Sequence, residues 1–163
     1  MVSGPYGKGI DFSDDGVRIA FAGGTGVLTF IDLVARIAMK VLNGLNSSTR
    51  LNKSEILSPT ADVAHHTFIL YVSFMDEKSA IALELLTNLN NFCERNQLRD
   101  FKLVVRLSSQ KGARWDDAYI RKELAQYDRH IQNVMVCGPP PMTETFDRLF
   151  TRLAAENYNG LTR

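Results

Sequence analysis

Four short apolar runs, each followed by a segment with helical periodicity, constrain the fold of this chain most strongly. They occupy 17–22, 67–74, 101–108 and 133–137. Apolar runs of this length, bounded by turn residues, are typical of strands buried on both faces of a parallel sheet. Strands that alternate with helices build right-handed βαβ units and one open sheet between two helical layers. The pattern predicts a single α/β domain with a three-layer, doubly wound, Rossmann-like parallel sheet.

The segments between the apolar runs predict four helices. They lie at 27–42, near 80–95, from Asp116 or Asp117 onward, and near 142–157. In the first, Asp32, Arg36 and Lys40 recur at four-residue steps and form a polar stripe on an otherwise apolar helix. Asn43-Gly44 is expected to end that helix. The polar segment 44–66 is longer than an ordinary helix-to-strand connection, which predicts an exposed insertion.

Charge and cysteine content exclude several classes of function. The 163 residues include 19 Lys and Arg against 18 Asp and Glu, so we expect no nucleic acid or anionic membrane as the main partner. The most apolar predicted helix is too short and too charged to span a bilayer. Cys93 and Cys137 lack the spacing of a disulfide framework or a zinc site, so we expect no metal and a reduced, cytoplasmic environment.

Helix-breaking residues gather at two places. Seven of the eleven glycines lie within the first 26 residues, and three of the five prolines are consecutive at 139–141. The Gly-Gly-Thr-Gly sequence at 23–26 follows the first predicted strand, and the Gly-Pro-Pro-Pro sequence at 138–141 follows the fourth. A strand order of 3-2-1-4 makes these strands neighbours at the point where the order reverses, which is where such sheets bind ligands.

The two clusters have different chemistry. Glycines before a helix let the backbone approach an anion, and the helix start adds free N–H groups, so 23–26 suits a phosphate. On this interpretation, a side chain at Gly26 would fill the space that a pyrophosphate needs. Because Thr29 stands where the G-x-G-x-x-G fingerprint has its third glycine, the turn alone leaves a merely structural role open. The prolines predict a rigid, donor-poor wall, or alternatively a stiff helix entry beside a buried Cys137.

Taken in order, three motifs resemble a known family. They are Gly-Pro-Tyr-Gly at 4–7, Ala-Gly-Gly-Thr-Gly-Val at 22–27 with Phe30 soon after, and Cys-Gly-Pro-Pro-Pro-Met at 137–142. Their order and spacing resemble the signatures of the ferredoxin-NADP reductase superfamily. Within it, the chain looks most like the pyridine-nucleotide domain of cytochrome-b5 reductases, ferric-chelate reductases and NADPH-oxidase-type proteins.

The resemblance implies a site for NADH or NADPH across the strand ends. It implies a pyrophosphate at 23–27 and a nicotinamide near Thr25 and 137–142. Thr25 and Cys137 are then the residues at the reacting ring, and Cys137 tunes geometry without acting as a nucleophile. The implied nucleotide-binding residues are Gly23, Gly24, Thr25, Gly26, Val27, Ser108, Lys111, Arg114, Cys137, Gly138, Pro139, Pro140 and Met142.

The resemblance also implies partners. In the family, hydride passes to FAD held by a barrel domain, and electrons leave one at a time to a haem, metal or iron-sulfur acceptor. The family's Arg-x-Tyr-Ser/Thr motif for FAD is absent here, and 1–16 resembles only the tail of that barrel, with 17–163 as the nucleotide-binding domain. We therefore expect an FAD-binding barrel in cis or in trans. A membrane is expected only through segments outside this sequence, which would put the domain on the cytosolic face.

Two alternatives remain open at this point. One is a stand-alone nucleotide-binding subunit or sensor of a redox complex, without flavin chemistry of its own. The other is a different α/β protein whose glycine turn holds a mononucleotide, although the Gly-Lys-Ser/Thr of a P-loop is missing.

The choice between NADH and NADPH depends on the residues at and after the end of the third predicted strand. Ser108 matches the serine that NADP-specific relatives carry, but no arginine follows it. Lys111 and Arg114 are candidates to supply the missing charge, because cations hold a 2′-phosphate. Asp76 and Glu77, after the second strand, would repel that phosphate, so the sequence favours NADH.

Two further features are weaker. Trp115 and Tyr119 are candidates to stack on adenine, and packing of the third helix explains them equally well. His65-His66 resembles half a metal site but has no cysteine partners nearby.

Overall fold

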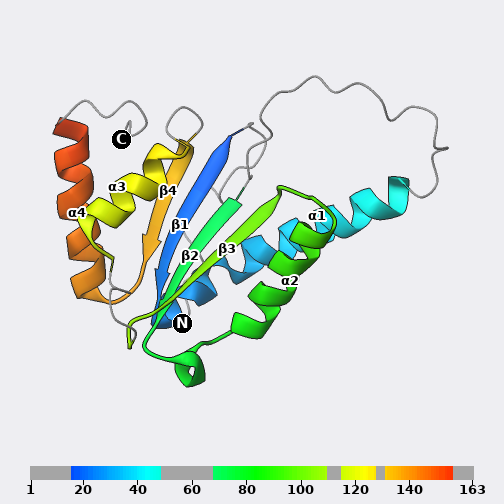
Figure 1. The fold of residues 1–163 in the computed structure, drawn as a ribbon, viewed down its shortest axis with the longest axis horizontal. Coiled ribbons are helices and arrows are strands. Elements are labelled where there is room, and N and C mark those ends of the chain that lie inside the picture. The colour runs from blue at the N-terminus through cyan, green and yellow to red at the C-terminus, as the bar shows by residue number, and fades with distance from the viewer. Residues whose placement is uncertain (1–15, 49–67, 110–114, 128–130, 156–163) are drawn as a thin grey trace, which may run out of the picture.

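Four parallel strands form one sheet in the computed structural model, which describes residues 16–48, 68–109, 115–127 and 131–155. The strands are β1 (Val17–Gly23), β2 (Phe68–Phe74), β3 (Phe101–Leu107) and β4 (Ile131–Cys137). Their order is β3-β2-β1-β4 (Figure 1). The predicted fold class and strand order are therefore confirmed.

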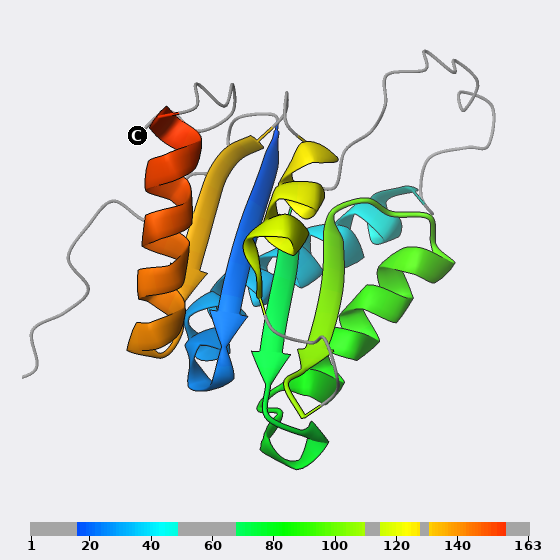
Figure 2. The same cartoon turned by 60° about the vertical axis from the view of Figure 1, so that its left-hand side comes forward.

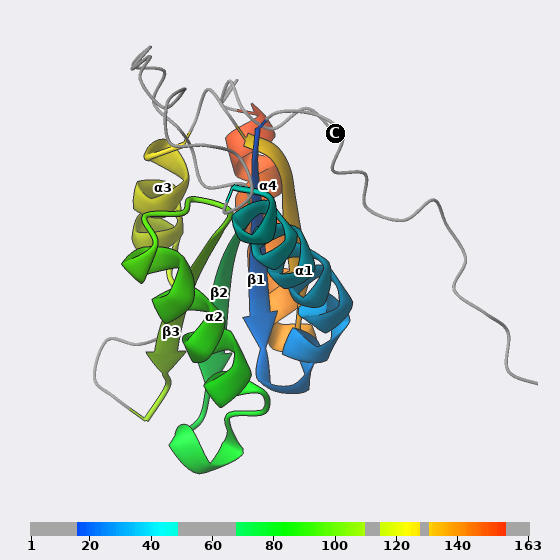
Figure 3. The same cartoon turned by 90° about the vertical axis from the view of Figure 1, so that its right-hand side faces the viewer.

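Helices cover both faces of the sheet. α1 (Ile31–Ser48) and α2 (Leu83–Arg95) pack on one face, and α3 (Asp117–Ala125) and α4 (Pro140–Ala155) on the other (Figure 3). A 3-10 helix, η1 (Gly24–Phe30), joins β1 to α1, and a second, η2 (Glu77–Ser79), precedes α2. Within the described ranges, no helix combines the length and the apolar character that crossing a membrane requires.

The central strand β1 contributes to two separate cores because its side chains alternate between the faces. Ala20 and Ala22 face the core under α1 and α2, whereas Ile19 and Phe21 face the core under α3 and α4. All seven residues of β1 are buried. A strand buried on both sides needs apolar residues at successive positions, which explains its run from Ile19 to Ala22; Arg18, before that run, is also buried.

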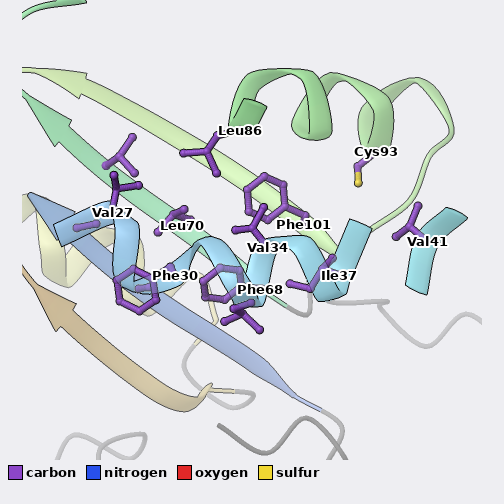
Figure 4. Close-up of a cluster of buried hydrophobic side chains, with 14 of the residues drawn as sticks. Val27, Phe30, Val34, Ile37, Val41, Phe68, Leu70, Leu86, Cys93 and Phe101 are labelled. Atoms are coloured by element: carbon purple, nitrogen blue, oxygen red, sulfur yellow. The ribbon is translucent and has the colours of Figure 1, made fainter. Parts of the chain in front are cut away.

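The core under α1 and α2 follows helical spacing (Figure 4). Its buried members from the first helical segment recur at three- and four-residue steps and pack against Phe68, Leu70 and Phe101; they are Phe30, Val34, Ile37 and Val41. The polar stripe predicted for this helix lies outside, with Arg36 and Lys40 exposed. Burial, helped by the nearby Asp100, raises the pKa of the Cys93 thiol, so Cys93 packs as a neutral side chain.

The core under α3 and α4 is aromatic. Phe21 stacks on Tyr71 with 4.8 Å between ring centroids, and Trp115 meets Phe21 edge-on at 5.5 Å. Burial raises the pKa of Tyr71, as does its hydrogen bond to Glu123, so the Tyr71 hydroxyl stays protonated and donates to Glu123 Oε2 at 2.8 Å. Trp115 and Tyr119 lie against each other at 5.8 Å. The packing role of this aromatic pair is therefore observed, and stacking on adenine stays a prediction.

Two helix boundaries differ from the prediction. The first helical segment starts with η1 at Gly24 and runs to Ser48 as α1, so the predicted end at Asn43-Gly44 is wrong. A glycine inside a helix costs about 1 kcal/mol relative to alanine, which the packed face of α1 tolerates. α4 begins at Pro140, not at Met142, because proline fits the first helical position and needs no N–H there. The remainder of the predicted insertion, from residue 49 onward, lies outside the described residues.

Neighbouring leucines of α2 provide a test of this core. Leu86 is 0% exposed, whereas Leu85 is 55% exposed. We expect Leu86→Ala to lower the free energy of unfolding by about 2–5 kcal/mol, because it leaves a cavity between α2 and the sheet. Leu85→Ala, the matched control, should change it by less than about 1 kcal/mol. Urea unfolding followed by circular dichroism measures both, and equal effects would contradict the placement of α2.

Candidate functional site

The carboxyl ends of the four strands lie at one edge of the sheet (Figure 2). After β1 the chain continues into η1 and α1 on one face, and after β4 it continues into α4 on the other. β1 and β4 are adjacent and parallel, with Ala22 paired to Cys137 at their ends. The order of the strands therefore reverses between β1 and β4, as predicted, and the glycine and proline clusters meet there.

Three glycines bring the two turns into backbone contact. A Cβ built on Gly26 would fall on the carbonyl group of Cys137, and one built on Gly23 or on Gly138 would lie 2.6 Å from Met142 Sδ. At Gly26 the obstacle is backbone, so that position has no room for a side chain. At Gly23 and Gly138 the obstacle is the end of the flexible Met142 side chain, which can move aside. The interpretation of Gly26 as space for a pyrophosphate is wrong, because the space beside its Cα is filled by the backbone of β4.

Gly24 differs from its neighbours. It has a φ of +53°, and a Cβ there would meet no atom within 4 Å. Among the described residues, no side chain caps the start of η1, and Thr25 is exposed beside it. Val27, in contrast, is 0% exposed and anchors η1 to the core. Of the predicted residues in this turn, Gly24 and Thr25 are the ones that face open space.

The turn between β4 and α4 presents an apolar surface. Pro139 and Pro140 are exposed, and Cys137 is half-buried behind them. The backbone amides of Met142 and Thr143 both donate to the Pro139 carbonyl, at 2.9 and 3.2 Å. Because the prolines carry no N–H, residues 139–143 have no amide hydrogen left for an anion. This surface suits a flat, uncharged ring better than a phosphate.

A small pocket joins the ends of β2 and β3 to the start of α4. Its volume is about 120 Å³, and it is lined by Ser73, Ser108, Trp115, Met142, Thr145 and Phe146. The indole N–H of Trp115 is buried and has no hydrogen-bond partner within the described part of the chain. The pocket brings together Ser108, which follows β3, and Met142, which lies in the first turn of α4. Lys111 and Arg114 lie outside the described residues.

A second, wider groove lies along α3 and α4. It measures about 710 Å³ and is lined by Asp117, Thr145, Asp147, Arg148, Thr151 and Arg152. An ion pair between Arg152 and Asp117 links the two helices there. Apart from Thr145, its residues lie away from the strand ends and include none of the predicted nucleotide-binding positions, so we place the site at the smaller pocket and the two turns.

The sequence pattern did not reveal Thr29 or Ser73. Thr29 Oγ1 lies 3.2 Å from Cys137 Sγ, so a hydrogen bond joins η1 to the end of β4. In the sequence, Thr29 stood out only as a departure from the glycine fingerprint. Ser73 is the second-to-last residue of β2, and a polar residue this close to the carboxyl end of a predicted strand is a signal that could have found it.

Asp76 is engaged in its own turn. Its Oδ1 accepts a hydrogen bond from the Ser79 amide at 2.8 Å, and Ser79 Oγ accepts one from the Asp76 amide at 3.2 Å. This capping box holds η2, which follows β2 at the same edge of the sheet (Figure 2). Glu77 is exposed next to it.

Comparison with known proteins yields a likeness of fold. No protein-family model matches the chain, and no curated protein is similar to it. Among solved structures, it is similar to the cytochrome b5 reductase domain of Ulva prolifera nitrate reductase, with 18% identity and a TM-score of 0.49. The match covers 84% of this chain and 45% of that chain, so this chain spans less than half of its length.

The backbone contact at Gly26 can be tested by substitution. We expect Gly26→Ala to lower the free energy of unfolding by more than about 2 kcal/mol, because overpacking against a backbone carbonyl has no cheap relaxation. Gly24→Asn, at a positive φ with open space, should cost less than about 1 kcal/mol, since asparagine tolerates that conformation. Urea unfolding of both variants measures the difference. A Gly26→Ala variant as stable as the unaltered chain would contradict the contact.

Proposed function

We propose that this chain is the NAD(P)H-binding part of a flavin-dependent oxidoreductase. The observation that carries the proposal is the contact between the glycine turn after β1 and the proline turn after β4, where the strand order reverses. Doubly wound sheets bind dinucleotides at this point. The two turns also hold the motifs that resemble the ferredoxin-NADP reductase superfamily.

The turn at the start of η1 fits a pyrophosphate. Gly24 provides open space for a close approach, and the first N–H groups of η1 have no side-chain cap among the described residues. Unpaired amides at a helix start favour an anion because they donate hydrogen bonds and carry partial positive charge. We assign the pyrophosphate to Gly24 and Thr25, with Gly23, Gly26 and Val27 supporting the turn from behind.

The proline turn fits the nicotinamide. Pro139 and Pro140 form an exposed apolar surface, and Cys137 is half-buried next to it. Reduced nicotinamide supplies a hydride when bound. The residues of this chain would orient the ring and keep water from one of its faces, and Thr25 is the polar side chain that the resemblance implies there. Cys137 acts here by its shape and position.

The pocket at Ser108 fits the adenosine end. Its volume of about 120 Å³ suits a single sugar-sized group and not a whole dinucleotide, so the rest of the cofactor would lie across the open strand ends. The Ser73 and Ser108 side chains that line the pocket are suited to ribose hydroxyls. Met142 borders both this pocket and the glycine contact, which connects the two ends of the site.

The proposal includes an acceptor outside this chain. FAD would be held mainly by a barrel domain in cis or in trans, and a haem, metal or iron-sulfur protein would receive the electrons. Residues 17–163 would form the nucleotide-binding domain. The motif at 4–7 that resembles the tail of the barrel lies outside the described residues.

A matched pair of variants at Gly24 tests the pyrophosphate assignment. Asparagine and aspartate have nearly the same shape and both tolerate a positive φ, but only aspartate adds a negative charge. We expect Gly24→Asp to bind NADH and ADP-ribose at least about tenfold more weakly than Gly24→Asn, because the carboxylate repels the pyrophosphate. Isothermal titration measures both affinities. Equal affinities in two folded variants would move the pyrophosphate away from this turn.

The preference for NADH is a separate prediction. The site has Ser108 but no arginine directly after it, so we expect the chain to bind NADH at least about threefold more tightly than NADPH. Titration of the unaltered chain with both nucleotides measures the ratio. Tighter binding of NADPH that is lost in Lys111→Ala or Arg114→Ala would reverse the assignment.

A further inference from the structure

The hydrogen bond between Thr29 and Cys137 crosses the point where the strand order reverses. The two residues are 108 positions apart, and Thr29 Oγ1 lies 3.2 Å from Cys137 Sγ. Thr29 is exposed on η1, and Cys137 is half-buried at the end of β4. The two backbones lie close together beside this pair, because a Cβ on Gly26 would fall on the Cys137 carbonyl.

This contact restricts the Cys137 side chain. A cysteine side chain has three staggered positions about its Cα–Cβ bond, and a hydrogen bond to a fixed neighbour favours one of them. Thr29 is held in position, since Val27 before it and Phe30 after it on η1 are both buried in the core. Without the Thr29 hydroxyl, the sulfur would be free to occupy the other positions, which alters the surface next to Pro139.

We propose that Thr29 is a positioning residue that holds the Cys137 thiol in place and so sets the affinity of the site for the nicotinamide ring. The inference rests on the proposed function, since it takes the surface at Cys137 and Pro139 as the nicotinamide site. It separates the two ends of the cofactor, because neither Thr29 nor Cys137 lines the pocket at Ser108. Thr29 therefore affects ring binding and leaves binding of the ADP-ribose portion unchanged.

The first experiment compares NADH with ADP-ribose, which lacks the nicotinamide ring. Isothermal titration is carried out on the unaltered chain, Thr29→Val, Thr29→Ser and the remote control Thr151→Val. We expect Thr29→Val to weaken NADH binding about three- to tenfold, the range for one lost hydrogen bond. ADP-ribose affinity should stay within about twofold of the unaltered chain. Thr29→Ser should restore NADH affinity, because serine keeps the hydroxyl.

The second experiment measures the thiol directly and needs no nucleotide. The rate at which iodoacetamide alkylates Cys137 is followed by mass spectrometry of the cysteine peptides. We expect Cys137 to react several times faster in Thr29→Val than in the unaltered chain or in Thr29→Ser. Cys93, which is 0% exposed and has a raised pKa, serves as the internal control for unfolding and should react slowly throughout.

Each outcome supports or overturns the inference. Equal weakening of NADH and ADP-ribose in Thr29→Val, or unchanged binding of both, overturns the positioning role while leaving the proposed function intact. An unchanged alkylation rate of Cys137 overturns it as well. If the unaltered chain binds neither NADH nor ADP-ribose, the proposed function fails, and the assignment of Thr29 to the nicotinamide fails with it.

Discussion

The structure depends on the complete burial of β1. This strand pairs with β2 on one side and β4 on the other, and its alternating side chains enter both cores. Small residues at Ala20 and Ala22 let α1 approach one face, whereas Phe21 is the centre of the aromatic core on the other. Burial of apolar area at both faces stabilises a strand whose own contacts are mostly distant in sequence. The helices on either face are thereby held in place, and with them the turns that leave β1 and β4.

The glycine-rich turn serves two purposes that sequence alone does not separate. Gly23 and Gly26 let protein atoms approach one another, because a side chain at either position would meet the β4–α4 turn. Gly24 faces open space and adopts a positive φ, so it is the position where a ligand rather than the protein would use the missing side chain. A glycine motif of this kind can therefore be structural at most of its positions and still form part of a site.

The two turns divide the proposed chemistry by polarity. The start of η1 has amides without a side-chain cap among the described residues, whereas residues 139–143 have no amide hydrogen left for a ligand. An anion is thus favoured at one turn and an apolar ring at the other, which is the combination that the proposed dinucleotide would need. The hydrogen bond from Thr29 to Cys137 connects the polar turn to the apolar one. Its position at the junction is what makes it suited to a positioning role.

The general topology of doubly wound sheets predicted the strand order. The sequence by itself determined the α/β class and the edge of the sheet at which the motifs gather. These follow from local patterns, namely the length of the apolar runs, helical spacing and the glycines and prolines after β1 and β4. It wrongly predicted that α1 ends at Asn43-Gly44, whereas α1 continues to Ser48, since one glycine inside a helix costs only about 1 kcal/mol. Only the tertiary structure decided that Gly26 faces the Cys137 carbonyl, that Ser108 and Met142 share a pocket and that Thr29 reaches Cys137. The reason is physical: contacts between residues far apart in the chain depend on how the strands pair and on where each side chain points, and neither leaves a periodic signal in the sequence.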